Sequence, residues 1–182
     1  DADAALRFNL AHADALAICA VLSGGEEIGV DVERVRPMAE MDAVARTTFS
    51  PRELAHFHAL PASARLRAFY EAWTRKEAFV KALGCGLSRR LDSFDVAFGP
   101  GEPARLLRSL ADPVETERFT LHAFEPEAGY IGAVAVAGKP ARVRHLSWDW
   151  GRHAAPSPLD GRDGHVPPRL SQEGIRGLRV DG

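Results

Sequence analysis

Two carboxylates share one face of a predicted strand, and a third stands on the apolar face of a predicted helix. Asp31 and Glu33 are two residues apart in an alternating segment, so they point to the same side as Gly29. Glu77 falls among the apolar positions of a helix predicted over 61–84. A buried carboxylate needs a cation, a proton or a pocket. If the helix crosses the strand, three oxygens converge as Mg²⁺ prefers, with substrate phosphate completing its shell.

A lysine extends this chemistry. Lys81 lies one turn beyond Glu77 on the same side of the helix, in a chain whose 23 basic residues include only three lysines, Lys76, Lys81 and Lys139. A metal to neutralise charge, a carboxylate base and a lysine at the leaving group together suit phosphoryl transfer. The residues alone leave another interpretation open, in which the strand carboxylates form a solvated face and the helix pair is an exposed ion pair.

The remaining pattern predicts an α+β fold, with an antiparallel sheet packed by one long helix and shorter helices. Ser50-Pro51-Arg52-Glu53 is a capping box with proline at the first helical position, and Gly84 ends the long helix. Ser23-Gly24-Gly25 between two strand-like runs predicts a hairpin. The predicted strands are 6–10, 15–22, 27–35, 94–98, 117–124, 130–137 and 141–146, and the predicted helices are 40–48, 50–60 and 61–84.

Composition argues against several classes of protein. The 182 residues carry a net charge of −2, which gives no electrostatic case for a nucleic-acid partner. No apolar run approaches the roughly 20 residues of a membrane span. The first ten residues do not resemble a signal peptide, and two cysteines do not make a disulfide framework, so we expect a cytoplasmic protein. Glycine, proline and scattered arginine predict a disordered tail over 147–182, which leaves a catalytic domain over 1–146.

Several segments, in order and with matching spacing, resemble the 4′-phosphopantetheinyl transferases. The two-part signature of that family resembles Gly29-Val30-Asp31-Val32-Glu33 and Trp73-Thr74-Arg75-Lys76-Glu77-Ala78-Phe79-Val80-Lys81. Its FN(L/I)SH segment resembles Phe8-Asn9-Leu10-Ala11-His12. Shorter matches are Phe49-Ser50, Gly84-Cys85-Gly86-Leu87, Leu91-Asp92-Ser93-Phe94 and Gly129-Tyr130. The resemblance covers residues 6–137 and favours the metal-site interpretation.

The resemblance implies an enzyme that transfers 4′-phosphopantetheine from coenzyme A to a serine of an acyl, polyketide or peptidyl carrier protein, releasing 3′,5′-ADP. By position, Asp31, Glu33 and Glu77 would hold Mg²⁺, for which Mn²⁺ could substitute. Glu77 would also take the serine proton, directly or through water. Lys81 would stabilise the transferring phosphate and the departing nucleotide.

Two further residues are implied in binding coenzyme A. His12 would contact its 3′-phosphate. Lys76 is a second candidate for a phosphate, although a solvent-facing side chain is an equal alternative, because Lys76 lies 100° from Glu77 around the helix.

The order of the motifs selects a subclass. His12 precedes Asp31, as in the surfactin-type enzymes, which form a pseudo-dimer of two similar halves with coenzyme A between them. We expect nearly all of the first half to be missing here, and Ala11 and Ala13 replace two hydroxyl donors of the family pattern. Activity should then be weak unless that half or an oligomeric partner completes the site. The alternatives are a degenerate module that binds coenzyme A or a carrier protein without turnover, and another Mg²⁺-dependent phosphoryl enzyme such as a phosphatase.

Overall fold

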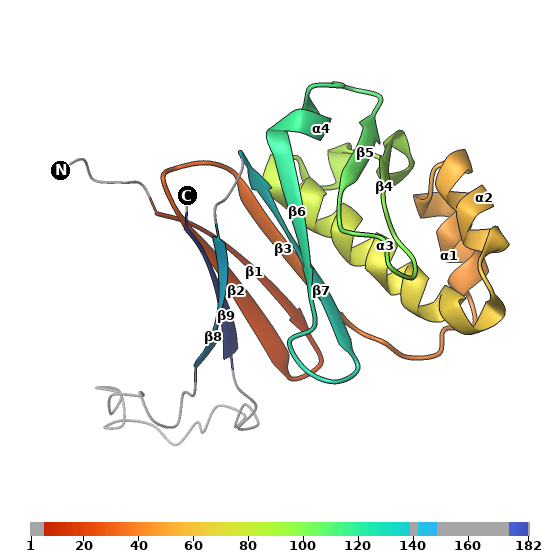
Figure 1. Ribbon diagram of the computed structural model, residues 1–182, viewed down its shortest axis with the longest axis horizontal. Helices are drawn as coiled ribbons and strands as arrows, with labels where there is room; N and C mark the ends of the chain where they lie inside the picture. Colours follow the sequence, from red (N-terminus) through yellow and green to blue (C-terminus); the bar gives the residue numbers. More distant parts are fainter. Residues whose placement is uncertain (1–5, 139–141, 149–174, 182) are drawn as a thin grey trace, which may run out of the picture.

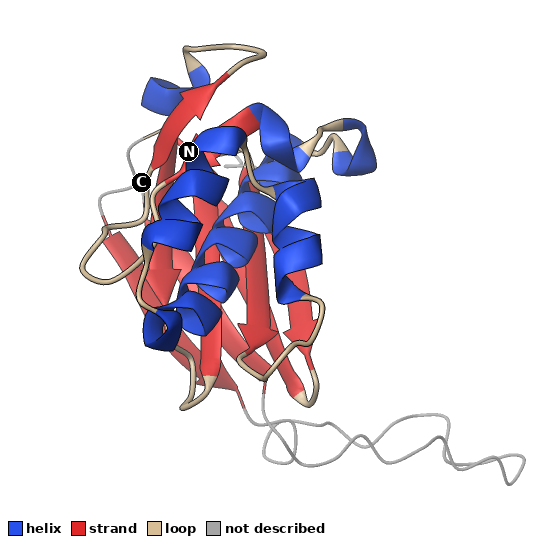
Figure 2. Cartoon of the chain, turned by 90° about the vertical axis from the view of Figure 1, so that its right-hand side faces the viewer, coloured by secondary structure: helices blue, strands red, loops and turns tan. Residues whose placement is uncertain are grey.

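The computed structural model describes residues 6–138, 142–148 and 175–181, in which the strands form three sheets. The two larger sheets and a long helix form three layers (Figure 1), and the third sheet has only two strands. Figure 2 shows the helices gathered on one side of the strands, which confirms the α+β class. The elements are β1 (Leu6–Ala13), β2 (Leu16–Ser23), β3 (Ile28–Arg34), α1 (Met41–Thr48), α2 (Pro51–Ala59), α3 (Ala62–Leu83), η1 (Gly86–Ser88), η2 (Leu91–Ser93), β4 (Phe94–Val96), β5 (Leu106–Ser109), α4 (Glu115–Arg118), β6 (Phe119–Phe124), β7 (Tyr130–Ala137), β8 (Arg142–Trp148) and β9 (Ile175–Asp181).

The first sheet has the strand order β1-β2-β9-β8. β1 and β2 pair antiparallel, whereas β9 runs parallel to β2 and antiparallel to β8. Alternation along β2 buries one face of this sheet, including Ile18, Ala20 and Leu22, against the second sheet. The other face of β1 is apolar and exposed, since Phe8 is 64% and Leu10 is 57% accessible.

The second sheet has the antiparallel order β3-β7-β6 and lies between the first sheet and α3 (Figure 1). Val30 and Val32 of β3 pack toward the first sheet. The alternate residues of β3 therefore face α3, and this face includes Gly29, Asp31 and Glu33. Because both of its faces are covered, the middle strand β7 is apolar along most of its length.

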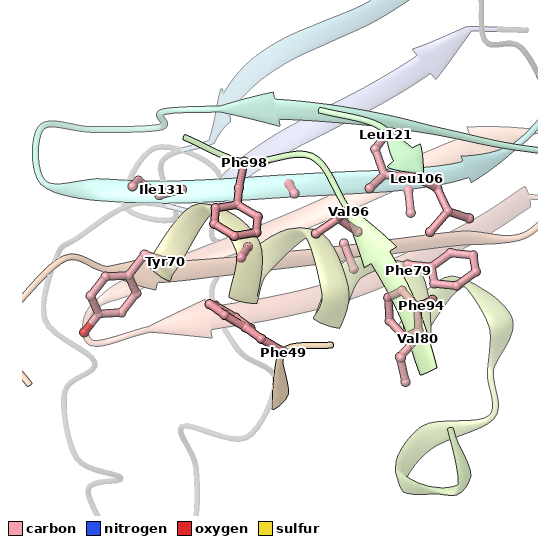
Figure 3. Close-up of a cluster of buried hydrophobic side chains, with 14 of the residues drawn as sticks. Phe49, Tyr70, Phe79, Val80, Phe94, Val96, Phe98, Leu106, Leu121 and Ile131 are labelled. Carbon is pink, nitrogen blue, oxygen red and sulfur yellow. The ribbon is translucent and has the colours of Figure 1, made fainter. Parts of the chain in front are cut away.

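The helices confirm the local signals in the sequence. Glu53 donates its backbone N–H to the Ser50 hydroxyl at 3.2 Å, and Ser50 donates its own backbone N–H to the Glu53 carboxylate at 2.8 Å, which completes the predicted capping box. Gly84 ends α3 at a φ of 66°. α3 packs into an aromatic core that includes its own Phe79 together with Phe49 and Phe94 (Figure 3). No helix in the described ranges is long and apolar enough to cross a membrane.

Two expectations about the strands were wrong. The predicted hairpin between 15–22 and 27–35 does not form, because β2 pairs with β1 and β9 while β3 pairs with β7. The turn only carries the chain from one sheet to the other. The predicted disordered tail includes β9, and Leu178 in that strand is 2% exposed. β9 finds its partners far away in the chain, so local periodicity did not indicate it. Residues 149–174 and 182 of that tail lie outside the described residues.

Candidate active site

Gly29 lets α3 approach β3 more closely than any other residue would allow. A Cβ built on Gly29 would stand 2.2 Å from the carbonyl oxygen of Ala78 and 2.3 Å from the backbone nitrogen of Ala82. Both atoms belong to the helix backbone and cannot move aside. This contact brings the helix face that carries Lys81 directly over β3.

Replacing Gly29 with alanine should therefore destabilise the fold by about 3 kcal/mol, the upper part of the range for overpacking. The matched control is Gly177→Ala, also in a strand, where an added Cβ would make only ordinary contacts, with Leu146 Cβ at 3.6 Å and the carbonyl oxygens of Cys19 and Leu146 at 3.9 Å. Urea denaturation of both variants measures the difference. Equal stability of the two variants would contradict the close helix–strand contact.

Asp31 is the most deeply buried acidic residue of this face. It is 6% exposed, and its Oδ1 accepts a hydrogen bond from Lys81 Nζ at 2.6 Å. The same ammonium donates to the carbonyl oxygen of Val30 at 3.2 Å. The other carboxylate oxygen, Oδ2, is buried and has no hydrogen-bond partner among the described residues. The pKa of Asp31 is raised to about 7: burial is the main cause, the charges of Glu33 and Glu77 act in the same direction, and Lys81 acts in the opposite direction.

The other two carboxylates lie close to Asp31. Glu33 is partly buried, and this burial raises its pKa, as does the nearby charge of Glu77. A hydrogen bond from the Trp73 side chain, together with the charges of Arg36 and Lys81, acts in the opposite direction. Asp31 and Glu33 of β3 and Glu77 of α3, called here the carboxylate cluster, thus lie close enough for their charges to influence one another. Sequence reasoning counted Trp73 only as an apolar residue and missed its bond to Glu33.

The donor chemistry of the carboxylate cluster fits a hard divalent cation. Carboxylates are the ligands that Mg²⁺ prefers, and these three repel one another, while Asp31 Oδ2 is buried without a partner in the part of the chain that the structure describes. Within the described ranges, no three acidic, histidine or cysteine side chains converge closely enough to hold a metal by themselves. The predicted convergence of three metal-ligating carboxylates is therefore not seen among the described residues, and Mg²⁺ binding by Asp31, Glu33 and Glu77 stays a prediction, in which water and substrate phosphate would complete the shell.

The raised pKa of Asp31 makes stability depend on pH in the absence of a cation. Between its ordinary pKa of 3.8 and the raised value of about 7, the folded chain keeps a proton that the unfolded chain has released. Stability therefore falls as pH rises through this window. When the pH rises from 5 to 8 in EDTA, the free energy of unfolding should fall by about 2–3 kcal/mol more in the unaltered chain than in Asp31→Asn. Urea denaturation at both pH values measures this, and an identical pH dependence of the two chains would contradict the assignment.

Lys76 does not fit either interpretation made from the sequence. Its side chain is 0% exposed, so it neither faces solvent nor reaches a ligand. Its ammonium donates to the Glu53 carboxylate at 2.7 Å and to the carbonyl oxygens of Leu91 and Phe94 at 2.8 and 2.6 Å. These three bonds use all three donors of an ammonium group. The prediction that Lys76 binds a phosphate of coenzyme A was therefore wrong.

His12 lies on a different side of the molecule from the carboxylate cluster. It is exposed on the outer face of the first sheet, while its neighbours Ala11 and Ala13 point inward. Asp14, which follows in the turn after β1, pairs with Arg34 at 2.9 Å and so brings this turn to the end of β3. The structure does not bring His12 together with the carboxylates, and its contact with the 3′-phosphate stays a prediction.

Comparison with known proteins places both parts of the signature inside one family. A family model described as the 4′-phosphopantetheinyl transferase superfamily matches residues 27–135. The chain is 36% identical over 137 residues to 4′-phosphopantetheinyl transferase HetI of Nostoc sp., covering 75% of this chain and 54% of that protein. It is 32% identical over 130 residues to 4′-phosphopantetheinyl transferase Sfp of Bacillus subtilis, covering 71% and 54%. The chain thus spans about half the length of these relatives.

A solved structure, the holo-[acyl-carrier-protein] synthase of Thermotoga maritima, aligns with a TM-score of 0.49 at 19% identity. The alignment covers 66% of this chain and 67% of that one.

Proposed function

The chain belongs to the 4′-phosphopantetheinyl transferase superfamily, its matches to Sfp and HetI support the surfactin-type class, and we propose that it transfers 4′-phosphopantetheine from coenzyme A to a carrier-protein serine. One observation carries this proposal: the Lys81 ammonium lies 2.6 Å from Asp31 Oδ1, the charges of Glu33 and Glu77 act on Asp31, and Asp31 Oδ2 is buried without a hydrogen-bond partner among the described residues. All four residues lie within the segment that the family model matches.

In the proposed reaction the serine oxygen forms a bond to the phosphorus that carries the pantetheine group. The bond from that phosphorus to the bridging oxygen of the pyrophosphate breaks, and 3′,5′-ADP leaves. Glu77 accepts the serine proton, directly or through a water molecule. Mg²⁺ or Mn²⁺, held by Asp31, Glu33 and Glu77, would neutralise the pyrophosphate charge.

Lys81 has two partners in this proposal. In the structure its ammonium is bound to Asp31, yet its side chain is still 31% exposed. We propose that the ammonium turns from Asp31 to the bridging oxygen of the pyrophosphate, where it stabilises the charge that develops on the departing nucleotide. Asp31 would then be free to help hold the cation.

The nucleotide end of coenzyme A has fewer candidate partners in this chain than the pyrophosphate has. His12 lies away from the carboxylate cluster, and Arg36, a cation near that cluster, lowers the pKa of Glu33. We propose that the chain needs a second half or an oligomeric partner for full activity. The exposed apolar side chains of β1, among them Phe8 and Leu10, support this, because such a patch commonly marks an interface.

Product analysis separates the proposed transfer from its alternatives. The chain is incubated with coenzyme A, Mg²⁺ and an unmodified carrier protein, and 3′,5′-ADP is quantified by chromatography. Transfer predicts that 3′,5′-ADP appears only when the carrier protein is present. Release without the carrier would indicate a hydrolytic phosphoryl enzyme, and coenzyme A binding in calorimetry without any release would indicate a module without turnover.

A further inference from the structure

A fully buried ion pair lies on the side of α3 that faces away from the carboxylate cluster. Lys76 is 0% and Glu53 is 4% exposed, and their charged atoms are 2.7 Å apart. The ammonium also lies over the ring of Phe94, 4.4 Å from its centroid, and Phe94 belongs to the aromatic core drawn in Figure 3. Burial lowers the pKa of Lys76 and raises that of Glu53, so each charge is maintained chiefly by its partner.

The pair joins three elements that are separate in sequence. Glu53 Oε2 accepts from the Ser50 backbone N–H at the start of α2, and Oε1 accepts from the Val96 N–H of β4 at 2.8 Å. Lys76, in the middle of α3, donates to the carbonyl oxygens of Leu91 and Phe94 around η2 and β4. Lys76 of α3 is thus bonded to two backbone carbonyl oxygens and to a carboxylate that is itself held by backbone N–H groups of α2 and β4.

Stability alone does not account for such a pair. Replacing a buried ion pair with apolar residues of similar volume is often neutral or stabilising, because removing two charges from water is costly. What the pair does provide is a fixed rotation of α3. Glu77 follows Lys76 directly, and a rotation of about 20° would move an atom roughly 6 Å from the helix axis by roughly 2 Å. A misplacement of about 1 Å can already reduce a reaction rate by about 10²-fold.

We propose that Lys76 and Glu53 are a positioning pair, which fixes the rotation of α3 so that Glu77 and Lys81 face the carboxylates of β3. The close approach at Gly29 sets the distance between helix and strand, and the buried pair sets the angle. The effect of this pair on catalysis rests on the proposed transfer, whereas its effect on the rotation of α3 does not. It also explains why an arginine-rich chain keeps a lysine here, since a compact ammonium fits three short bonds that a planar guanidinium does not.

The test replaces both charges together, in Glu53→Gln/Lys76→Met, so that neither is left buried alone. The hydrogen bond between Trp73 and Glu33 reports the rotation of α3 without any need for activity. The indole N–H resonance of Trp73, assigned by its loss in Trp73→Phe, should move toward the position of a free indole in the double variant. Mn²⁺ affinity, measured by electron paramagnetic resonance, should fall at least about tenfold, and carrier labelling per folded molecule about 10²-fold.

The matched control is Arg89→Met/Glu115→Gln, which removes another, partly buried ion pair, 2.7 Å long, whose two residues lie outside α3, although the Arg89 guanidinium lies 6.0 Å from the ring centroid of Phe79 in that helix. The control should keep the Trp73 resonance and the Mn²⁺ affinity even if it is less stable. An unchanged Trp73 resonance and Mn²⁺ affinity in a folded Glu53→Gln/Lys76→Met variant would overturn the inference. If that variant does not fold, Lys76→Arg, which keeps the charge, is judged by the same two readouts. If no chain labels a carrier, the proposed function fails, while these readouts still decide the positioning role.

Discussion

Replacing Glu77 with glutamine should lower the rate of phosphopantetheine transfer by about 10²- to 10⁴-fold, the range expected for loss of a general base. Glutamine has nearly the same shape as glutamate but cannot accept the serine proton. It also removes one negative charge from the carboxylate cluster, which weakens the proposed cation site. Because Glu77 is only partly buried and raises the pKa of Asp31 by repulsion, its replacement should leave the chain as stable as before or slightly more stable.

Steady-state labelling of a carrier protein and thermal unfolding measure these two effects of Glu77→Gln separately. Glu117→Gln, at an exposed glutamate of α4, is the control for a change of charge that leaves the site intact. A Glu77→Gln variant that kept more than half of the original labelling rate would remove Glu77 from the proposed mechanism.

Replacing Lys81 with arginine should reduce transfer by about 10²-fold, although the charge is conserved. The Lys81 ammonium fits between Asp31 Oδ1 at 2.6 Å and the Val30 carbonyl oxygen at 3.2 Å. A guanidinium is longer and planar, and it would bind Asp31 through two parallel hydrogen bonds. That stronger pairing should hold Asp31 away from the cation and hold the positive charge away from the phosphate.

Two measurements on Lys81→Arg separate this account from simple misfolding. Urea denaturation should show little loss of stability, because the buried carboxylate keeps a cationic partner. The apparent affinity for Mg²⁺ in the labelling assay should weaken together with the rate. A rate within about twofold of the unaltered chain would show that any cation serves at this position, contrary to the proposed role of Lys81.

The helices and most strands could be predicted because their signals are local. The capping box at Ser50 and the glycine at 84 are confirmed at the positions that the sequence indicated. The pairing of the strands could not be predicted in the same way. A hairpin with β2 and a position in a separate sheet both predict the alternating pattern that β3 shows, so the pattern could not decide between them. β9 pairs with β2 across more than 150 residues of chain, and no local pattern marks that contact.

The candidate site likewise contains residues whose positions could be predicted from the sequence and residues whose positions could not. Asp31 and Glu33 share a face because strands alternate, and Lys81 approaches Asp31 because Gly29 admits the helix backbone. Lys76 could not be placed from helix angle alone. Its environment depends on Glu53, which comes from another helix 23 residues earlier in the sequence. Periodicity gives the direction of a side chain from its own element, but not what the rest of the fold places there.

The most direct test of the central claim is the intact mass of a carrier protein after incubation with coenzyme A, Mg²⁺ and the chain, alone and extended at its N-terminus. The proposed site predicts a gain of one phosphopantetheine group that requires Mg²⁺ and is lost in Asp31→Asn. We expect slow labelling by the chain alone and faster labelling by the extended chain. Labelling at full rate by the chain alone would refute the need for a partner. No mass gain with either chain, or an equal gain with Asp31→Asn, would contradict the assignment of the carboxylate cluster as the transfer site.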